Sequence, residues 1–180
     1  ILAVGATGND GGGMASGHVR VFENQSGNWM QIGNDIDGES AFNSFGISIS
    51  LNSNGTILAV GASRNDGNGI DSGHVRVFQN QNGNWVQIGN DIDGEAADDF
   101  FGRTVDLNSD GTILAAGAPF NDGNGVDSGH VRVFQNQNGN WLQIGNDIDG
   151  EAAGDNFNAV SLNADGTILA VGAQSNDGNG

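Results

Sequence analysis

The chain has 180 residues, a formal net charge of −17, 32 glycines, one proline and no cysteine. The missing cysteine excludes disulfide scaffolds and zinc–cysteine sites, and 22 acids against five arginines exclude the basic surface that nucleic acid requires. No apolar run approaches the ~20 residues of a membrane-spanning helix, so we expect no membrane insertion. A hydrophobic content of 36% is nevertheless too high for a disordered acidic tail.

The sequence repeats itself. The segment ILAVGA opens the chain and returns three times, once as ILAAGA, at starts 56, 56 and 55 residues apart. Such regularity is typical of a tandem array of near-identical units. Because the chain begins and ends inside a repeat, we expect it to be a window on a longer array. The units are repeat 1 at residues 1–56, repeat 2 at 57–112, repeat 3 at 113–167 and the start of repeat 4 at 168–180.

In chain order, the first elements expected within a unit are two strands joined by a tight turn. Phe45–Leu51 alternates with the period of a strand. Asn54-Gly55 then predicts a type I′ hairpin turn, which needs positive φ at both central residues. Ile57–Ala62 is a short apolar run, typical of a strand covered on both faces.

A polar, glycine-rich loop leads to two further strands. Gly73–Gln79 predicts a third strand, with Val75 and Val77 on one face. A second tight turn is expected at Asn82-Gly83, and Trp85–Ile92 predicts the fourth strand. An acidic stretch then leads into the next unit.

Four short strands per unit, with no helical period, predict an all-β fold of β-propeller blades, each a four-stranded antiparallel sheet. One such sheet cannot bury both of its faces alone, so neighbouring blades must stack on it. The three units and one extra segment indicate a partial propeller. The alternatives are an open stack of the same sheets or a β-solenoid, although solenoid repeats are usually shorter.

The repeated motifs resemble the FG-GAP repeats of integrin-α-type β-propellers. The resemblance lies in Phe45-Gly46 followed by Gly61-Ala62, and in Phe101-Gly102 followed by Gly117-Ala118-Pro119. It extends over all three units, although Phe157-Asn158 replaces the FG pair in the last. The resemblance implies a closed propeller in an extracellular or surface protein that serves adhesion or ligand binding. Some fungal lectins with similar blades bind sugars between them.

The family's calcium loop has acids that this chain keeps only in part. The best copy has Asp106, Asn108 and Asp110 but carries Leu114 where the last acid should stand. Calcium requires six to eight oxygen ligands. The loop is therefore either a weak Ca²⁺ site or a plain hairpin turn, and the turn needs fewer assumptions.

Two further acidic clusters recur in successive units. The first has acids at i, i+2 and i+4, which extended backbone would place on one side. The second lies in the glycine-rich loop, where side-chain and main-chain oxygens could converge. Each cluster is read either as a weak Ca²⁺ site or as a solvated acidic loop. The candidate ligands are Asp91, Asp93 and Glu95 in the first cluster, and Asp66, Asn68 and Asp71, with their counterparts Asp122, Asn124 and Asp127, in the second.

The repeated histidines do not predict a shared zinc ion, because equivalent residues of successive blades lie far apart. His18, His74 and His130 are expected instead to pack between blades or to pair with acids. Asp71, Ser72 and His74 contain the residue types of a hydrolytic triad, but nothing in their spacing indicates convergence. We therefore expect no enzyme.

The repeated arginines and tryptophans can be interpreted as structural or as functional residues. The arginines at positions 20, 76 and 132 are expected to pair with neighbouring acidic loops. Trp29, Trp85 and Trp141 follow Asn-Gly-Asn turns, and either pack at the blade edge or stack on sugars.

The function expected from the sequence is non-catalytic. The leading hypothesis is an extracellular or surface module for adhesion or assembly, with a protein partner or self-association through open blade edges. The alternative is a lectin that binds glycans between blades. No cofactor other than Ca²⁺ is expected.

Overall fold

The computed structural model describes residues 1–178, and every regular element in that range is a β-strand. No helix in this range is long and apolar enough to cross a membrane. The strands are β1 Leu2–Ala6, β2 His18–Gln25, β3 Asn28–Gln31, β4 Ile36–Asp37, β5 Ser48–Leu51, β6 Ile57–Ala62, β7 His74–Gln81, β8 Asn84–Gln87, β9 Ile92–Asp93, β10 Thr104–Leu107, β11 Ile113–Ala118, β12 His130–Gln137, β13 Asn140–Gln143, β14 Ile148–Asp149, β15 Phe157–Leu162 and β16 Leu169–Ala173.

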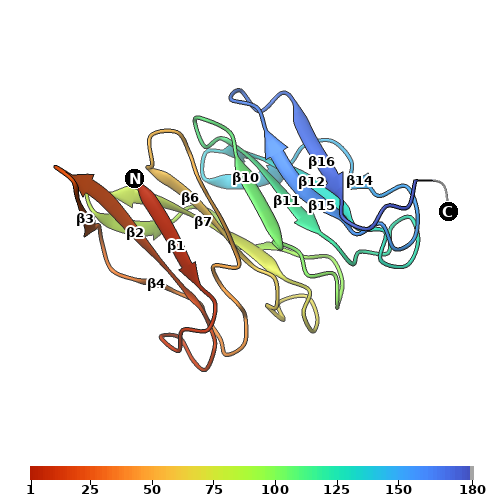
Figure 1. Cartoon of the computed structure of the whole chain (residues 1–180), viewed down its shortest axis with the longest axis horizontal. Helices are drawn as coiled ribbons and strands as arrows, with labels where there is room; N and C mark the ends of the chain where they lie inside the picture. Colours follow the sequence, from red (N-terminus) through yellow and green to blue (C-terminus); the bar gives the residue numbers. More distant parts are fainter. Residues whose placement is uncertain (179–180) are drawn as a thin grey trace.

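The strands form antiparallel sheets that follow one another along the chain. Two sheets are complete, with strand orders β5-β6-β7-β8 and β10-β11-β12-β13. The short strands β9 and β14 extend them by pairing with β7 and β12. The first sheet contains β1-β2-β3 and β4, and the last contains β15 and β16. Figure 1 shows the sheets side by side, with β1 and β16 in different sheets that lie apart. The β-propeller blades are thus confirmed, and over residues 1–178 they do not close into a ring.

The second strand of a unit is buried on both faces, as the apolar run predicts. All six residues of β6 and all six of β11 are buried. The Asn82-Gly83 turn is confirmed as well, with φ of +56° and +90°. The Asn54-Gly55 turn is not type I′, because only Gly55 has a positive φ. Asn52 explains the difference, since its Oδ1 accepts the N–H groups of Thr56 and Ile57 and closes a longer loop.

The predicted first and fourth strands are interrupted. The first begins at Ser48 rather than Phe45, because Phe45 pairs instead with Gly17 of the preceding sheet. The fourth divides into β8 and β9. Between them Gly89 has a φ of +80°, and its backbone leaves the sheet. Glycine inside a strand pattern is a common mark of such a bulge.

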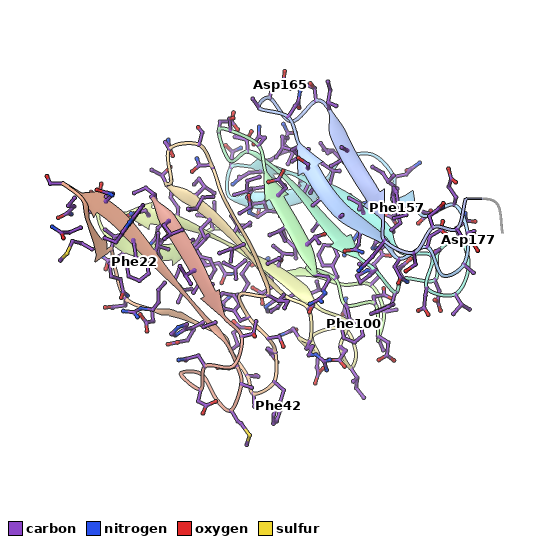
Figure 2. The ribbon with its side chains drawn as sticks, in the orientation of Figure 1. Phe22, Phe42, Phe100, Phe157, Asp165 and Asp177 are labelled. Atoms are coloured by element: carbon purple, nitrogen blue, oxygen red, sulfur yellow. The ribbon has the colours of Figure 1, made fainter. Side chains whose placement is uncertain are left out.

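The hydrophobic core lies between the sheets. One cluster joins Val19 and Val21 of β2 to Leu58 and Val60 of β6. A second cluster joins the following pair of sheets, and contains Phe101 together with strand residues from both. Figure 2 shows side chains crowded between neighbouring ribbons. Stacking of blades, rather than burial within one sheet, therefore stabilises the fold.

The glycine of the GA motif touches the backbone of the FG position across each blade interface, and at the first two interfaces that position is also glycine. A Cβ added to Gly61 would lie 2.9 Å from the carbonyl carbon of Gly102, and nearer still to its oxygen. The corresponding distance from Gly117 to the carbonyl carbon of Asn158 is 3.0 Å. The last unit is one residue shorter here, with Phe157-Asn158 in place of Phe101-Gly102-Arg103, and the strand register shifts between Phe157 and Ala159. Asn158 contacts Gly117 through its backbone carbonyl, so asparagine can occupy the position that glycine has in the other units.

Polar side chains link the first strands of successive blades. The Ser50 hydroxyl donates to Asp106 Oδ1 at 3.1 Å, and Leu162 N donates to Asp106 Oδ2 at 2.7 Å. One carboxylate therefore connects three blades.

The outermost sheet at the start of the chain lacks a covering neighbour. Leu2 and Val4 of β1 are 43% and 45% exposed. Their repeat equivalents Leu58 and Val60 are both fully buried. At the other end, Ile168 is 65% exposed, whereas its equivalent Ile57 is buried. The chain thus presents an apolar face at each end of the stack.

Candidate functional site

Two equivalent clusters of histidine and carboxylate lie between the blades. The first contains Glu39, His74 and Asp91, and the second Glu95, His130 and Asp147. Within each, the possible ligand atoms lie within 4.8 Å of one another. The histidine and the aspartate come from one blade, and the glutamate comes from the loop that leaves the preceding blade. The histidines were expected to pack between blades or to pair with acids, and the contacts of His74 and His130 confirm this. What spacing along the sequence did not reveal is that the acids around these two histidines come from two units. His18 lies near Asp35 and Asp37 of its own unit.

The histidine of each cluster is buried. His74 Nδ1 lies 3.6 Å from Asp91 Oδ2, and His130 Nδ1 lies 4.0 Å from Glu95 Oε2. Burial lowers the pKa of His74 to about 4; the Asp91 carboxylate opposes this shift and Arg76 adds to it. Burial also lowers the pKa of His130, and Arg132 acts in the same direction. Both imidazoles are therefore neutral at pH 7.

An arginine supplies the positive charge of each cluster. Arg76 lies 3.5 Å from Glu39 and 3.8 Å from Asp91. Arg132 lies 3.5 Å from Glu95, and its Nη2 donates to Asp93 O at 2.6 Å. These contacts confirm that the repeated arginines pair with acidic loops. Because a guanidinium already compensates the carboxylates, the clusters fit a divalent cation poorly.

The two guanidinium groups also lie over phenyl rings. Arg132 Cζ is 4.2 Å from the ring centroid of Phe101, and Arg76 Cζ is 5.5 Å from that of Phe45. Such cation–π contacts favour arginine where the group is largely removed from water. The phenylalanine of the FG motif therefore positions the arginine as well as filling the core.

The residues of the predicted calcium loop use their oxygens in other bonds. Asp106 accepts from the two neighbouring blades, as described above. Asn108 Oδ1 accepts the N–H groups of Thr112 and Ile113, and Asp110 Oδ1 accepts from Thr112 N. The loop is a hydrogen-bonded turn whose carboxylates do not converge, so it does not fit Ca²⁺ in this conformation.

The acidic triplet is only partly gathered, because Asp91 and Asp93 line one pocket whereas Glu95 lies apart from Asp91. Asp91 and Glu95 belong to the two different clusters, on opposite sides of one blade. The expectation of three carboxylates on one side is wrong for Glu95, because β9 ends at Asp93 and the chain turns at Gly94. Burial raises the pKa of Asp93, and its neighbour Asp91 adds to the rise.

The side chains of the glycine-rich loops form hydrogen bonds within their own loop and with the acidic segment of the same unit. Their oxygens do not gather around one point. The Asp66 carboxylate accepts Asp71 N at 2.9 Å, and Asn68 Nδ2 donates to Gly94 O at 2.9 Å. The third repeat does the same. There Asp122 accepts from Asp127 N and Asn124 Nδ2 donates to Gly150 O, both at 2.9 Å.

The residues of the triad-like motif have separate partners. Asp71 lies 3.7 Å from Arg64, and the Ser72 hydroxyl donates to Asn65 O at 3.3 Å. His74 pairs with Asp91, so the three side chains form no relay.

Two of the three tryptophans join neighbouring blades. The indole N–H of Trp85 donates to Ile32 O, and that of Trp141 donates to Ile88 O, both at 3.2 Å. Trp29, in the first sheet, is 50% exposed. Each of these two tryptophans lines a small pocket together with the arginine of its own sheet and two aspartates of the blade before it. The pockets have volumes of about 240 and 330 Å³; the first contains Asp35, Asp37, Arg76 and Trp85, and the second Asp91, Asp93, Arg132 and Trp141.

Comparison with known proteins supports the fold and the repeat. Residues 92–134 match the model of the FG-GAP repeat, which confirms the resemblance in that segment. No curated protein matches the chain.

Solved structures resemble the chain in fold alone. A putative 6-phosphogluconolactonase from Bacteroides uniformis has a TM-score of 0.56 and 18% identity, over 86% of this chain and 40% of that one. Hydrazine synthase from Kuenenia stuttgartiensis has a TM-score of 0.50 and 13% identity, over 86% of this chain and 35% of its own. The chain thus spans well under half the length of these proteins.

Proposed function

We propose that the chain is a non-catalytic β-propeller module for adhesion or assembly outside the cytoplasm, and that it associates head to tail with further copies of itself. The observation that carries the proposal is the pair of apolar end faces. Residues that are fully buried inside the stack are about half exposed at its start.

The two end faces match each other because internal interfaces are built from the same parts. Within the stack, Ile57 and Ala59 of β6 share one core cluster with Leu114 and Ala116 of β11. The repeat equivalents of the first pair are Ile168 and Ala170, which are both exposed on the last blade. The equivalents of the second pair are Leu2 and Val4. A second copy therefore supplies the surface that each end lacks, in a heterologous contact that can continue from copy to copy.

The test is the mass of the native protein in solution by light scattering. We expect species larger than 18.4 kDa, and we expect charge on either end face to dissociate them. The double variant Leu2→Glu/Val4→Glu and the single variant Ile168→Glu should each be monomeric alone. Mixed together, they should form a dimer, because each retains the face that the other has lost. The matched control is Val126→Glu, which is 68% exposed on a loop and should assemble like the unmodified chain.

Two results would contradict assembly. One is a monodisperse 18.4 kDa species at high protein concentration with a cooperative melt. The other is unchanged mass in both end-face variants, because these substitutions remove the apolar contact on which the association depends.

The second candidate function is carbohydrate binding between blades. The observation in its favour is the pair of equivalent pockets, each of which combines an indole, a guanidinium and carboxylates. A glycan array followed by titration should give two equivalent sites per chain, and Trp141→Ala should remove one. Trp29→Ala is the control, since that residue lines neither pocket. Failure of every glycan to bind, or equal effects of the two variants, would exclude this function.

A further inference from the structure

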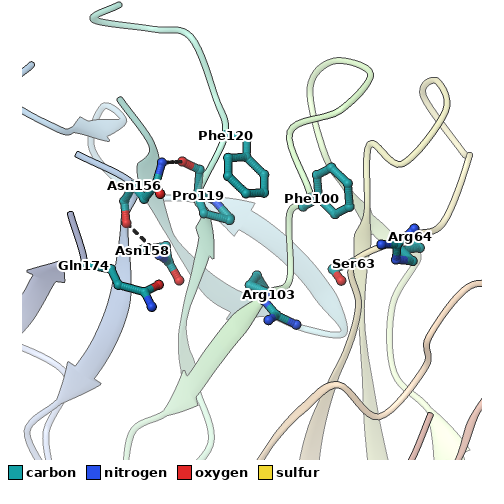
Figure 3. A pocket seen from close by; sticks show the side chains of 9 residues that line it. All are labelled: Ser63, Arg64, Phe100, Arg103, Pro119, Phe120, Asn156, Asn158 and Gln174. Carbon is teal, nitrogen blue, oxygen red and sulfur yellow. Dashed lines mark hydrogen bonds between the residues drawn. The ribbon is translucent and has the colours of Figure 1, made fainter. Parts of the chain in front are cut away.

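One pocket differs from all the repeated ones. It has a volume of about 260 Å³ and lies where loops of the second and third blades meet the last one. Figure 3 shows Phe100 and Phe120 on one rim, with Arg103 below them. No acid lines it, although the chain has 22. The two pockets beside Trp85 and Trp141, in contrast, are lined by aspartates.

This pocket is built from positions at which the repeats disagree. Arg103 stands where the preceding unit has Ile47, and Phe100 stands where it has Ser44. Arg64 and Phe120 occupy one repeat position, which is Gly8 in the first unit. Three of the five arginines recur with the repeat, and two of these, Arg76 and Arg132, pair with the clusters between blades. The two that do not recur, Arg64 and Arg103, both line this pocket.

The pocket therefore carries positive charge on a strongly acidic molecule. The guanidinium of Arg103 has no hydrogen bond or ion pair with any described residue, and it is exposed. Arg64 lies over the ring of Phe100 at 5.4 Å and has a distant partner in Asp71, at 3.7 Å. Arginine pairs with planar anions through parallel N–H donors. A carboxylate is the complementary group.

The opposite wall offers uncharged polar groups. Asn158 donates its amide N–H to Asn156 O at 2.7 Å, but its Oδ1 accepts no hydrogen bond from a described residue. The side-chain amide of Gln174 has no hydrogen-bond partner in the described chain. Phe100 and Phe120, whose centroids are 5.3 Å apart, add an apolar surface. A ligand ring with a carboxylate, hydroxyl groups and one apolar face complements the arginines, the amides and the phenyl rings of the pocket.

We propose that this pocket binds a hexuronate, a sugar ring with a carboxylate at C6, either free or within an acidic polysaccharide. Arg103 and Arg64 take the carboxylate, the Asn158 and Gln174 amides take ring hydroxyls, and the phenyl rings cover the C–H face. The volume is below the ~300–1,000 Å³ of pockets for larger ligands and suits a single ring. An aspartate or glutamate side chain of a peptide would leave the amides unpaired. This site uses a different surface from the assembly proposed above.

The experiment is titration of the full chain with sodium glucuronate and sodium galacturonate, followed by calorimetry and by NMR shifts of the Asn158 and Gln174 amides. Arg103→Gln should weaken binding by about tenfold or more, since it removes a charge-assisted bond. Gln174→Ala should weaken it less. Arg20→Gln is the matched control, because that exposed arginine recurs with the repeat and lies outside the pocket. Thermal melting establishes that each variant is folded.

Each result decides for or against the proposal. Binding of a uronate that is lost in Arg103→Gln and kept in Arg20→Gln supports it. Equal loss in the two arginine variants would show general charge attraction and overturn it. Equal binding of glucose would overturn the role of the carboxylate. Equal binding of glutamate or an acidic peptide would overturn the role of the sugar ring, and no binding at millimolar uronate would refute the site itself.

Discussion

Adding one methyl group at the glycine contact between blades should destabilise the fold. Gly61→Ala places a Cβ 2.9 Å from the carbonyl carbon of Gly102, closer than real Cβ atoms come. The φ of Gly61 lies outside the left-handed region, so the effect is steric alone. The obstacle is backbone, and the adjacent bond from Ser48 Oγ to Gly102 O, at 2.7 Å, must shift with it.

The expected cost is at the upper end of the range for overpacking, about 2–3 kcal/mol. In a chain of this length that corresponds to a fall in melting temperature of about 4–12 °C. Circular dichroism during heating and urea denaturation both measure it.

The chain provides its own control at the same repeat position. Gly172 on the last blade has only the Cβ of Ala159 near it, at 3.4 Å from an added Cβ, which is an ordinary contact. Gly172→Ala should change stability by no more than about 0.5 kcal/mol. If the two variants melt at the same temperature, the GA and FG glycines do not touch as described and the account of blade stacking fails.

Two further predictions concern charge. The pKa of His74 is about 4 in the folded state against 6.5 in the unfolded chain, so between these pH values the unfolded state binds more protons. The free energy of unfolding therefore falls as the pH drops through that window, by about 3 kcal/mol at most. Urea denaturation across the window should show a flatter slope for His74→Gln, and an unchanged slope would contradict the burial of this imidazole. For calcium, the loop carboxylates already accept N–H donors, so we expect Ca²⁺ and ionic-strength-matched Na⁺ to raise the melting temperature equally by screening the charge of −17. A distinctly larger rise with Ca²⁺ would restore the calcium proposal of the sequence.

The strands were predictable where a local pattern determines them. Alternation and apolar runs located the second and third strands of each unit, because these strands lie inside the sheet. The break in the fourth strand depends on Gly89, whose added Cβ would meet the Gly139 region of the next blade. Only packing between units reveals that contact, although glycine within a strand was a usable signal.

The candidate sites were harder to predict because they join different units. Spacing along one chain segment grouped Asp91 with Glu95, whereas the fold sends them to opposite interfaces. The pocket around Arg103 was missed because attention to the repeat hides the residues that depart from it. Aligning the units and marking their non-recurring charges would have identified Arg64 and Arg103 from the sequence.

The contact between the FG and GA motifs has a consequence for how the chain finds its native arrangement. Each interface rests on a glycine of one blade against a backbone carbonyl of the next. The segment GHVRVFQNQNGNW is identical at residues 73–85 and 129–141. Backbone contacts carry little information about which unit is the correct neighbour. Connectivity must therefore select the partner, through the short loops that leave each blade. Exchange of equivalent strands between copies is the misassembly to which such an array is most exposed during refolding.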